Sequence, residues 1–457
     1  MQTHLGLEAR IDSPQQREKL ALLDGTPIRY REWPKWPRAD STTQRNVLDV
    51  LHSTKWTLSG QSDRLLSYEQ RFARAFAEYC GRQYCVPCGN GTAALTIGLQ
   101  SLGVGPGDEV IVPGLTWVAC ASAVCHLGAI PILADIDPST LCISAASVQE
   151  LITPRTAAVM TVHLYSSLAP VTDIMRLVTE LGIAMIEDAS QAHGAKTNGH
   201  RTGSFGDVSA FSMQQSKLLT SGEGGACLTD DHIAYRQMQQ FRADGRGFAG
   251  TDGYDPYREI VPYGEVLGRN LCLSEFHAAI LLNALERLDL ENSHRHRNFV
   301  QLRELLSDVP EVSLVVGEAA EVPTHYKVCL QFKADFLEGL EIGLVARALA
   351  EELSLPVEPI DAPLNANPLY CPLRSPQIGR LANATELYDP QRFHLPNATA
   401  AARCCVTLPH WCLLGDRSDL HDIVSAVVKI VQLRDELSQI KLADLRRYPF
   451  RTLRTQR

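Results

Sequence analysis

Short apolar runs alternate with helical patterns between about residue 65 and residue 290, and this alternation is the feature that most constrains the fold. Five runs are short and apolar enough to be buried strands: Val110–Val112, Ile130–Ala134, Ala157–His163, Ala184–Glu187 and Val208–Phe211. Amphipathic patterns predict helices at Ser67–Ala77, Thr92–Leu102, Val118–Leu127 and Ile174–Leu181. Strands that alternate with helices form a mainly parallel sheet covered on both faces, so the sequence predicts an α/β fold.

The rest of the chain predicts a second domain and two terminal segments. A charged helical pattern at Glu286–Leu306 leads from the alternating region into a more proline-rich stretch. We predict an N-terminal segment at 1–40, a large domain at 41–290, a smaller C-terminal domain at 291–430, and a charged helical or disordered tail at 431–457. The N-terminal segment contains Trp33-Pro34-Lys35-Trp36-Pro37, whose prolines stiffen the backbone.

The composition is that of an ordinary globular protein and argues against some partners. Of the 457 residues, 45% are hydrophobic and 21% are charged. The formal net charge of -9 argues against a nucleic-acid-binding protein, in which basic residues gather. No run of about 18 apolar residues occurs, so we expect no membrane-spanning helix. The first ten residues show no apolar signal core, and we expect a cytoplasmic protein.

Thirteen cysteines are scattered through apolar or helical stretches, as expected for reduced thiols that pack as small hydrophobic side chains. One Cys-x-x-Cys motif occurs, Cys85-Val86-Pro87-Cys88. A zinc site would require a second cysteine pair or nearby histidines, and none follows, so we predict no metal site. A thioredoxin-like redox pair would lie at the start of a helix after a strand, and this alternative stays open.

A lysine and a carboxylate occupy positions that suit covalent chemistry with a carbonyl compound. Lys217 follows the polar run Gln214-Gln215-Ser216, and Asp188 follows a predicted strand. Lysine forms imines with carbonyls, and in pyridoxal phosphate enzymes an acidic residue pairs with the pyridinium nitrogen. Alone, Lys217 would be interpreted as a solvated surface charge, so the prediction depends on its neighbours.

Further segments supply the other groups that this cofactor needs. Cys88-Gly89-Asn90-Gly91-Thr92 opens a predicted helix whose free N–H groups can bind a phosphate, with a plain turn as the alternative. Trp117 follows a strand, and its ring could stack on a planar cofactor or pack in a core or interface. Three more residues after strands could be functional or structural: His163, Tyr165 and His193. Open α/β sheets bind ligands at strand ends, so the segments together predict a pyridoxal phosphate site.

In order and sequence, these motifs resemble those of the DegT/DnrJ/StrS sugar aminotransferases, which belong to fold type I of the pyridoxal phosphate enzymes. The matching runs are Gly89–Leu95, Gly107–Pro113, Ile186–Ala195, the loop around Lys217, and Gly268–Phe276. The resemblance covers about residues 30 to 430. It implies an aspartate aminotransferase-like fold, with a large domain on a mostly parallel mixed sheet and a smaller C-terminal α/β domain.

The resemblance also implies a role for each matching residue. Lys217 would hold the cofactor as a Schiff base, and Asp188 would keep the pyridine nitrogen protonated. Gln191 would contact the ring hydroxyl, and Trp117 would stack on the ring. The phosphate would be bound by Gly91, Thr92 and Ser212, together with Asn270 of the partner subunit. The substrate would be contacted by His163, Tyr165, His193 and Arg246. Family members are homodimers with a shared active site, and we expect the same here.

Within the family, the chain looks most similar to the glutamine-dependent scyllo-inosose and 2-deoxy-scyllo-inosose aminotransferases of aminocyclitol antibiotic pathways. The similarity is seen in three segments: Phe211–Lys217, Phe241–Arg246 and Ala362–Tyr370. Ser166-Ser167 stands where many nucleotide-sugar enzymes have Gly-Gln. The expected reaction transfers the amino group of L-glutamine to a cyclic ketone.

Three alternatives stay open. The acceptor could be a nucleotide-linked keto-sugar, or the enzyme could make 3-amino-5-hydroxybenzoate. The third is a sensor or scaffold that binds pyridoxal phosphate but has lost transamination, and the presence of Lys217 with Asp188 argues against it. The carboxylate of the donor could be bound by any of three arginines that spacing does not distinguish: Arg242, Arg246 and Arg269.

Overall fold

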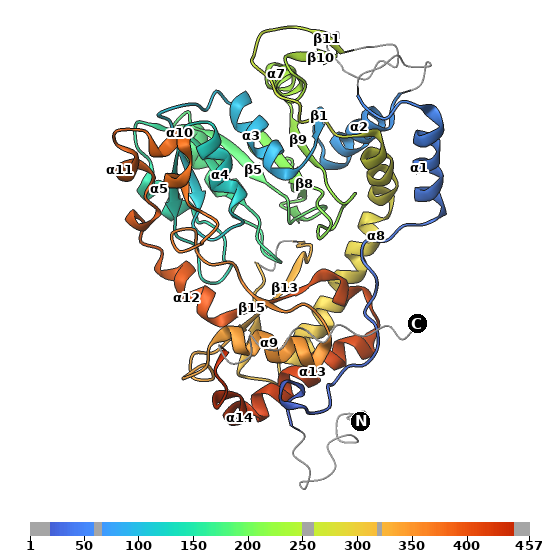
Figure 1. Cartoon of the computed structure of the whole chain (residues 1–457), viewed down its shortest axis with the longest axis vertical. Coiled ribbons are helices and arrows are strands. Elements are labelled where there is room, and N and C mark those ends of the chain that lie inside the picture. The colour runs from blue at the N-terminus through green and yellow to red at the C-terminus, as the bar shows by residue number, and fades with distance from the viewer. Residues whose placement is uncertain (1–18, 59–65, 249–259, 318–321, 443–457) are drawn as a thin grey trace.

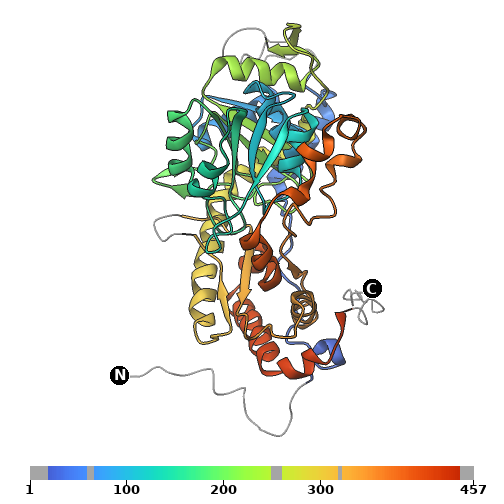
Figure 2. The ribbon, with the colours of Figure 1, turned by 90° about the vertical axis from the view of Figure 1, so that its left-hand side faces the viewer.

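The computed structural model describes residues 19–58, 66–248, 260–317 and 322–442, which form an elongated molecule with an upper and a lower part (Figures 1 and 2). The beginning of the predicted N-terminal segment, residues 1–18, and most of the predicted tail, residues 443–457, lie outside the described residues. Within the described ranges, none of the helices combines the length and the apolar content that crossing a bilayer would need.

A seven-stranded sheet forms the centre of the upper part. Its strands, in spatial order, are β1 (Tyr84–Cys88), β9 (Gly225–Thr229), β8 (Val208–Ser212), β5 (Ala184–Asp188), β4 (Thr156–Val162), β2 (Glu109–Pro113) and β3 (Ile130–Ala134). Only β9 runs against the other strands of this sheet. The five predicted strands are all present, and the predicted mostly parallel mixed sheet is confirmed.

Helices cover both faces of this sheet because its strands are apolar on both sides. In β2, Val110 and Val112 pack in the core beneath one set of helices, whereas Ile111 packs in the core on the opposite face. The first face carries α3 (Gly91–Ser101), α4 (Ala119–His126) and α7 (His232–Arg242). The second face carries α2 (Tyr68–Cys80), α5 (Ala145–Leu151) and α6 (Val171–Glu180).

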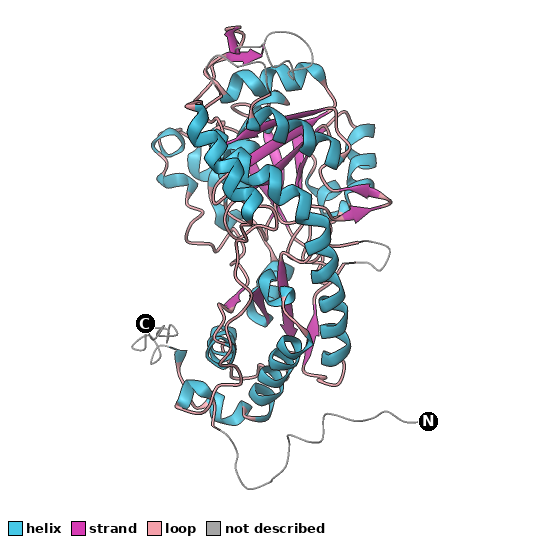
Figure 3. Cartoon of the chain, turned by 90° about the vertical axis from the view of Figure 1, so that its right-hand side faces the viewer, coloured by secondary structure: helices cyan, strands magenta, loops and turns pink. Residues whose placement is uncertain are grey.

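Helix α8 (Glu275–Leu306) joins the two parts of the molecule (Figure 3). It begins well before Glu286, where the predicted helix starts, because the Ser274 side chain accepts a hydrogen bond from the His277 backbone N–H and caps it. The N-terminal half packs against α1 (Ser41–Ser53) and α2, and the C-terminal half reaches the core of the lower part.

The lower part is built on a four-stranded antiparallel sheet in the order β12 (Val312–Leu314), β13 (Lys327–Phe332), β15 (Cys405–Pro409) and β14 (Glu358–Pro359). Helices α9 (Ile342–Leu353) and α13 (Arg417–Gln432) share its apolar core. The remaining elements are short: η2 (Ala21–Leu23), β6 (Lys196–Thr197), β7 (His200–Arg201), β10 (Arg246–Phe248), β11 (Ile260–Pro262), η3 (Pro372–Arg374), α10 (Pro376–Gly379), α11 (Ala384–Tyr388), η4 (Pro390–Arg392), α12 (Pro396–Cys404), η5 (His410–Leu414) and α14 (Arg434–Ser438).

Two segments pack away from their neighbours in sequence. Residues 360–404 lie within the predicted second domain, yet Tyr388 donates a hydrogen bond to the Gly128 carbonyl of the upper part. Residues 19–40, which we call the N-terminal strap, begin on the lower part, where Leu20 is buried in its core. The predicted boundaries at 40, 290 and 430 stay predictions, and we propose that the beginning of the strap belongs to the smaller domain.

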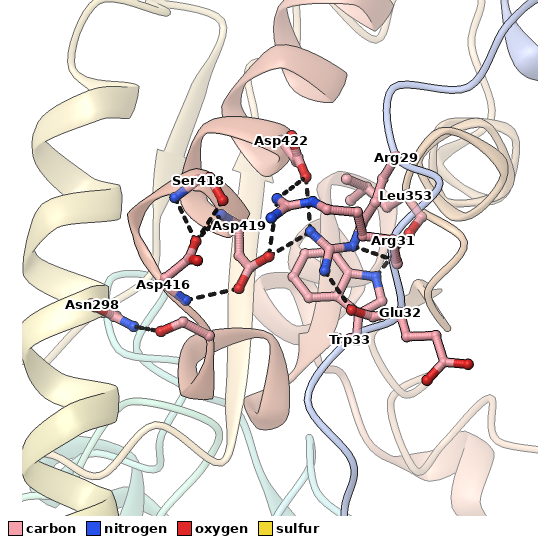
Figure 4. Close-up of polar contacts among 11 residues, drawn as sticks. Arg29, Arg31, Glu32, Trp33, Asn298, Leu353, Asp416, Ser418, Asp419 and Asp422 are labelled. Atoms are coloured by element: carbon pink, nitrogen blue, oxygen red, sulfur yellow. Dashed lines mark hydrogen bonds and ion pairs between the residues drawn. The ribbon is translucent and has the colours of Figure 1, made fainter.

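Ion pairs fix the strap to α13 (Figure 4). The buried Arg29 guanidinium donates to Asp419 at 2.6 Å and to Asp422 at 2.8 Å. The Trp33 indole N–H donates to the Leu353 carbonyl at 2.8 Å, and the Arg29 guanidinium lies 3.7 Å from the centre of the Trp33 ring. The strap then runs upward to α1, so it spans both parts of the molecule.

Candidate active site

The residues predicted to bind the cofactor come together at one edge of the large sheet. Asp188 ends β5, Ser212 ends β8, Gly91 follows β1, and Trp117 follows β2. These four strands run in the same direction, so their carboxyl ends lie at the same edge. Open α/β sheets bind ligands at this edge, and the fold therefore brings the predicted residues to one place.

Lys217 lies in the loop 213–224, which joins β8 to β9 and is held by its own backbone. The Met213 N–H donates to the Gly224 carbonyl, the Gln215 N–H donates to the Gly222 carbonyl, and the Lys217 N–H donates to Gln214. The half-buried Lys217 ammonium lies 4.3 Å from the centre of the Tyr326 ring. This contact places the lysine at the junction between the large sheet and β13.

Asp188 is buried and receives two donors. The Ser190 N–H donates to Oδ1 at 3.0 Å, and the Cys120 thiol donates to Oδ2 at 3.3 Å. Burial, and next the negative charge of Asp188, raise the pKa of the Cys120 thiol well above its ordinary value, so the thiol stays protonated as a donor. The positive charge of Lys217 lowers the pKa of this thiol by a smaller amount.

Gly91 begins α3 in contact with the end of β8. A Cβ added to Gly91 would lie 2.6 Å from the Cβ and 3.1 Å from the Oγ of Ser212, so only glycine allows this approach. The Asn90 side chain caps the helix by accepting the Ala93 N–H at 2.8 Å. The remaining N–H groups at the start of α3 lie beside the Ser212 hydroxyl, and Thr92 is half-buried next to them. A helix N-terminus beside a hydroxyl supplies the donors with which proteins bind anions.

Gln191 and Tyr165 are joined through a backbone hydrogen bond. The Tyr165 N–H donates to Gln191 Oε1 at 2.9 Å, which leaves the amide NH₂ of Gln191 as the group able to donate to a ligand. Tyr165 has a φ of 58°, an unusual conformation for a residue with a side chain. Its buried hydroxyl makes no hydrogen bond of normal geometry with any described residue. Trp117 is 52% exposed.

The two predicted histidines differ in their surroundings. Both ring nitrogens of His163 are hydrogen-bonded. Nδ1 accepts a hydrogen bond from the Ala169 N–H at 3.0 Å. Nε2 therefore carries the proton and donates a hydrogen bond to the Glu187 carboxylate at 3.0 Å. His193 is completely buried, and neither ring nitrogen forms a hydrogen bond of normal geometry within the described part of the chain. Burial, and next the charge of Lys217, lower its pKa to about 3. The Ser212 backbone opposes this shift, and His193 is therefore a neutral, buried ring whose nitrogens make no hydrogen bond of normal geometry with a described residue.

The three candidate arginines are also distinguished. Arg242 is buried and donates to the Glu69 carboxylate and the Pro87 carbonyl, so its charge is neutralised inside the protein. Arg246 is half-buried at β10 and lies 3.5 Å from the Asp244 carboxylate. Arg269 and its neighbour Asn270 are exposed at the surface.

Tyr326 and His410 lie next to the lysine loop, although sequence reasoning did not single them out. The Tyr326 hydroxyl lies 2.9 Å from Ser216 Oγ, and His410 Nε2 lies 3.2 Å from the Ser216 carbonyl oxygen. Burial raises the pKa of Tyr326, but the charge of Lys217 and the hydrogen bond with Ser216 outweigh it, so the pKa lies below its ordinary value. No local signal marks either residue, because their partners lie far away in the sequence.

The cysteines form no second chemical site. Cys85 and Cys88 lie in β1, and residues three apart in a strand point to opposite faces, so the motif does not have the helix-start geometry of a thioredoxin-like pair. All thirteen cysteines lie within the described residues, and each is a free thiol. The described ranges also contain no group of three His, Cys, Asp or Glu side chains able to hold a metal ion.

The chain is similar to known aminotransferases along most of its length. The model of the DegT/DnrJ/EryC1/StrS aminotransferase family matches residues 37–428. The chain is 44% identical to an L-glutamine:2-deoxy-scyllo-inosose aminotransferase of Streptomyces kanamyceticus, over 93% of this chain and 100% of that protein. It is 40% identical to an L-glutamine:scyllo-inosose aminotransferase of Streptomyces griseus, over 92% and 99%.

Solved structures agree with these relatives. The crystal structure of 3-amino-5-hydroxybenzoic acid synthase superposes with a TM-score of 0.74 at 28% identity, covering 88% of this chain and 100% of that one. The likeness confirms the predicted α/β aminotransferase fold. With the family match covering most of the chain and the lysine, carboxylate and helix N-terminus at one sheet edge, the protein belongs to the DegT/DnrJ/EryC1/StrS aminotransferase family.

Proposed function

We propose that this aminotransferase uses pyridoxal phosphate to move the amino group of L-glutamine to a cyclic polyhydroxylated ketone, scyllo-inosose or 2-deoxy-scyllo-inosose, in aminocyclitol antibiotic biosynthesis. The observation that carries the proposal is that β5, which ends at Asp188, and β8, which leads into the loop of Lys217, are parallel neighbours whose carboxyl ends lie at the ligand-binding edge of the sheet. The choice of donor and acceptor is supported by relatives of those names at 40–44% identity.

The residues present fit this cofactor. The start of α3 and the Ser212 hydroxyl converge as a phosphate requires, because Gly91 has no side chain between them. The buried His193 ring nitrogens make no hydrogen bond of normal geometry with a described residue, as expected where a ligand or water completes the hydrogen bonds. When bound, pyridoxal phosphate supplies an aldehyde that exchanges amino groups and a ring that accepts electron density.

Each side chain then has a defined task. With the cofactor bound, the Lys217 amine would act as the nucleophile and would carry a proton to and from the reacting carbon. The buried Asp188 carboxylate would keep the pyridine nitrogen protonated, and the Cys120 thiol and Ser190 N–H hold that carboxylate in place. Gln191 would donate to the ring hydroxyl through its amide NH₂. The Tyr326 ring covers the Lys217 ammonium and limits the access of water to it.

A homodimer forms part of the proposal. Trp117 is half exposed although it stands at the ligand-binding edge, and Asn270 is exposed on the surface. A second copy that covers this edge would bury Trp117 against the cofactor and bring Asn270 of the partner subunit to the phosphate. A cytoplasmic location is also proposed, because thirteen free thiols suit a reducing compartment.

Spectroscopy tests the proposal directly. The purified protein, supplied with pyridoxal phosphate, should show a visible band that bleaches when L-glutamine is added, and Lys217→Ala should lack the covalent adduct that borohydride reduction traps on Lys217. The inososes should restore the band, whereas a nucleotide-linked keto-sugar should not. A protein that binds no pyridoxal phosphate would refute the cofactor. Restoration of the band only by the nucleotide-linked keto-sugar would replace the proposed acceptor.

A further inference from the structure

The N-terminal strap contains a tryptophan that the reaction itself does not explain. After its anchor on α13, the strap places the half-buried Trp36 beside the lysine loop. The Trp36 indole N–H donates to the Gln215 carbonyl at 3.0 Å. Gln215 lies two positions before Lys217, so the strap binds the backbone of the loop that carries the lysine.

His410 holds the next carbonyl of the same loop. Its ring meets the Trp36 ring edge to face, with the ring centres 4.6 Å apart. The Arg295 Nε–H, on α8, donates to His410 Nδ1 at 3.2 Å. Nδ1 is therefore an acceptor, so the proton is on Nε2, which donates to the Ser216 carbonyl 3.2 Å away. Burial, and next the charge of Arg295, lower the pKa of His410 well below its ordinary value, which keeps the ring in this neutral form.

Two consecutive carbonyls before Lys217 are thus each held by a ring from a distant segment. Trp36 comes from the strap, and His410 follows β15 of the lower sheet. Since a peptide plane is rigid, fixing the carbonyls of Gln215 and Ser216 fixes the direction in which the chain enters Lys217. We infer that Trp36 and His410 are positioning residues for Lys217, an inference that rests on the proposed function of that lysine.

The anchor of the strap extends this role to the lower part of the molecule. Arg29 and Trp33 hold the strap on α13 and on Leu353, a few residues before Trp36. A displacement of the lower sheet against the upper one would move His410 directly and Trp36 through the strap. The position of the small domain is in this way linked to the orientation of the lysine loop.

Two matched tryptophan variants test the inference. Trp36→Phe and Trp33→Phe each remove one indole N–H from the strap, but only Trp36 bonds the lysine loop, whereas Trp33 bonds Leu353. Amide hydrogen exchange of the full chain without cofactor should be about 2- to 10-fold faster over residues 213–222 in Trp36→Phe, the effect of one lost neutral hydrogen bond. Trp33→Phe should exchange in this loop as the wild type does, because the ion pairs of Arg29 with Asp419 and Asp422 still hold the strap on α13.

The histidine supplies a second, independent series. His410→Leu removes the donor to Ser216, whereas His410→Gln retains an amide NH₂ near the position of Nε2. Loop exchange should be faster in His410→Leu and largely restored in His410→Gln. In the protein with pyridoxal phosphate bound, the visible absorbance band titrates with a pH midpoint. This midpoint should shift in Trp36→Phe and His410→Leu and should not change in Trp33→Phe.

The outcomes separate this inference from the proposed function. Equal effects of the Trp36 and Trp33 variants on the loop, or unchanged exchange in both Trp36→Phe and His410→Leu, would overturn the positioning role. A wild-type protein that binds no pyridoxal phosphate would overturn the proposed function instead, and the exchange measurement without cofactor would still decide whether the two rings hold the loop.

Discussion

Gly91 lies so close to Ser212 that a Cβ on the glycine would be 2.6 Å from the Cβ of the serine. The contact joins the start of α3 to the end of β8, two elements far apart in the sequence. It brings helix N–H groups and a hydroxyl to one point, so the proposed phosphate site depends on the absence of a single methyl group.

Replacement of Gly91 by alanine should therefore damage cofactor binding. The added methyl group would push α3 away from β8, which should destabilise the fold by about 1–3 kcal/mol. Affinity for pyridoxal phosphate should fall at least about 10-fold, equivalent to about 1.4 kcal/mol. Fluorescence titration with the cofactor measures this. Gly105→Ala is the control, because a Cβ at Gly105 would meet no atom within 4 Å. Equal affinities of the two variants would contradict the phosphate assignment.

Asp188→Asn should slow the reaction while leaving the lysine able to hold the cofactor. The substitution retains the size of the side chain but removes the buried negative charge, so the rate of transamination with L-glutamine should fall at least about 100-fold. Stopped-flow bleaching of the visible band measures the rate. Cys120→Ala removes only a weak donor to Asp188, and its rate should fall by no more than about 10-fold. A Cys120 variant as slow as Asp188→Asn would assign the effect to packing.

His193 should make the protein sensitive to acid. Burial lowers its folded pKa to about 3, whereas the unfolded chain binds a proton near pH 6.5. Between these values the unfolded state binds more protons, so the folded state loses stability as pH falls. From pH 7 to pH 5, the wild type should lose about 2 kcal/mol more than His193→Asn. Urea unfolding at both pH values measures this, with His193→Gln expected to match His193→Asn. If all three proteins lost the same free energy of unfolding between pH 7 and pH 5, the His193 ring would be protonated in the folded state.

Arg29 should contribute far more to stability than its neighbour Arg31, although both pair with Asp422. The Arg29 side chain is 1% exposed, and the Arg31 side chain is 52% exposed. Arg29→Met would leave the buried Asp419 carboxylate without its main partner, and the free energy of unfolding should fall by about 3–5 kcal/mol. Arg31→Met should have a much smaller effect, because water screens an exposed pair. Denaturant unfolding compares them, and equal losses would mean that the buried pair does not anchor the strap.

Sequence patterns predicted much of the fold, and the exceptions have physical causes. The five predicted strands are apolar runs buried on both faces, which leaves a strong local signal. The sequence patterns did not predict strands β1 and β9, because three of the five residues in each are proline, cysteine, glycine or alanine and only a few are typical of strands. Helix α8 was predicted too short, since its apolar first half is buried between α1 and α2 and lacks the charged pattern of the second half.

The same division holds for the candidate site. Four of the site residues follow a predicted strand or open a predicted helix, and such positions already indicate the ligand-binding edge of a sheet: Lys217, Asp188, Gly91 and Ser212. By contrast, nothing local separates His163, which has both ring nitrogens bonded, from His193, which has neither. Arg242 was a candidate to bind the carboxylate of the amino donor, but the tertiary structure pairs it with the buried Glu69.

The sequence by itself determined the α/β class, the family resemblance and the residues proposed to bind the cofactor, because strand and helix periods and motif spacings depend on near neighbours in the chain. The tertiary structure alone decided which buried groups find partners, how the strap crosses from α13 to the lysine loop, and why Trp36, Arg295 and His410 meet beside Lys217. Those contacts depend on how distant segments pack, and no local pattern encodes the packing of segments that are hundreds of residues apart.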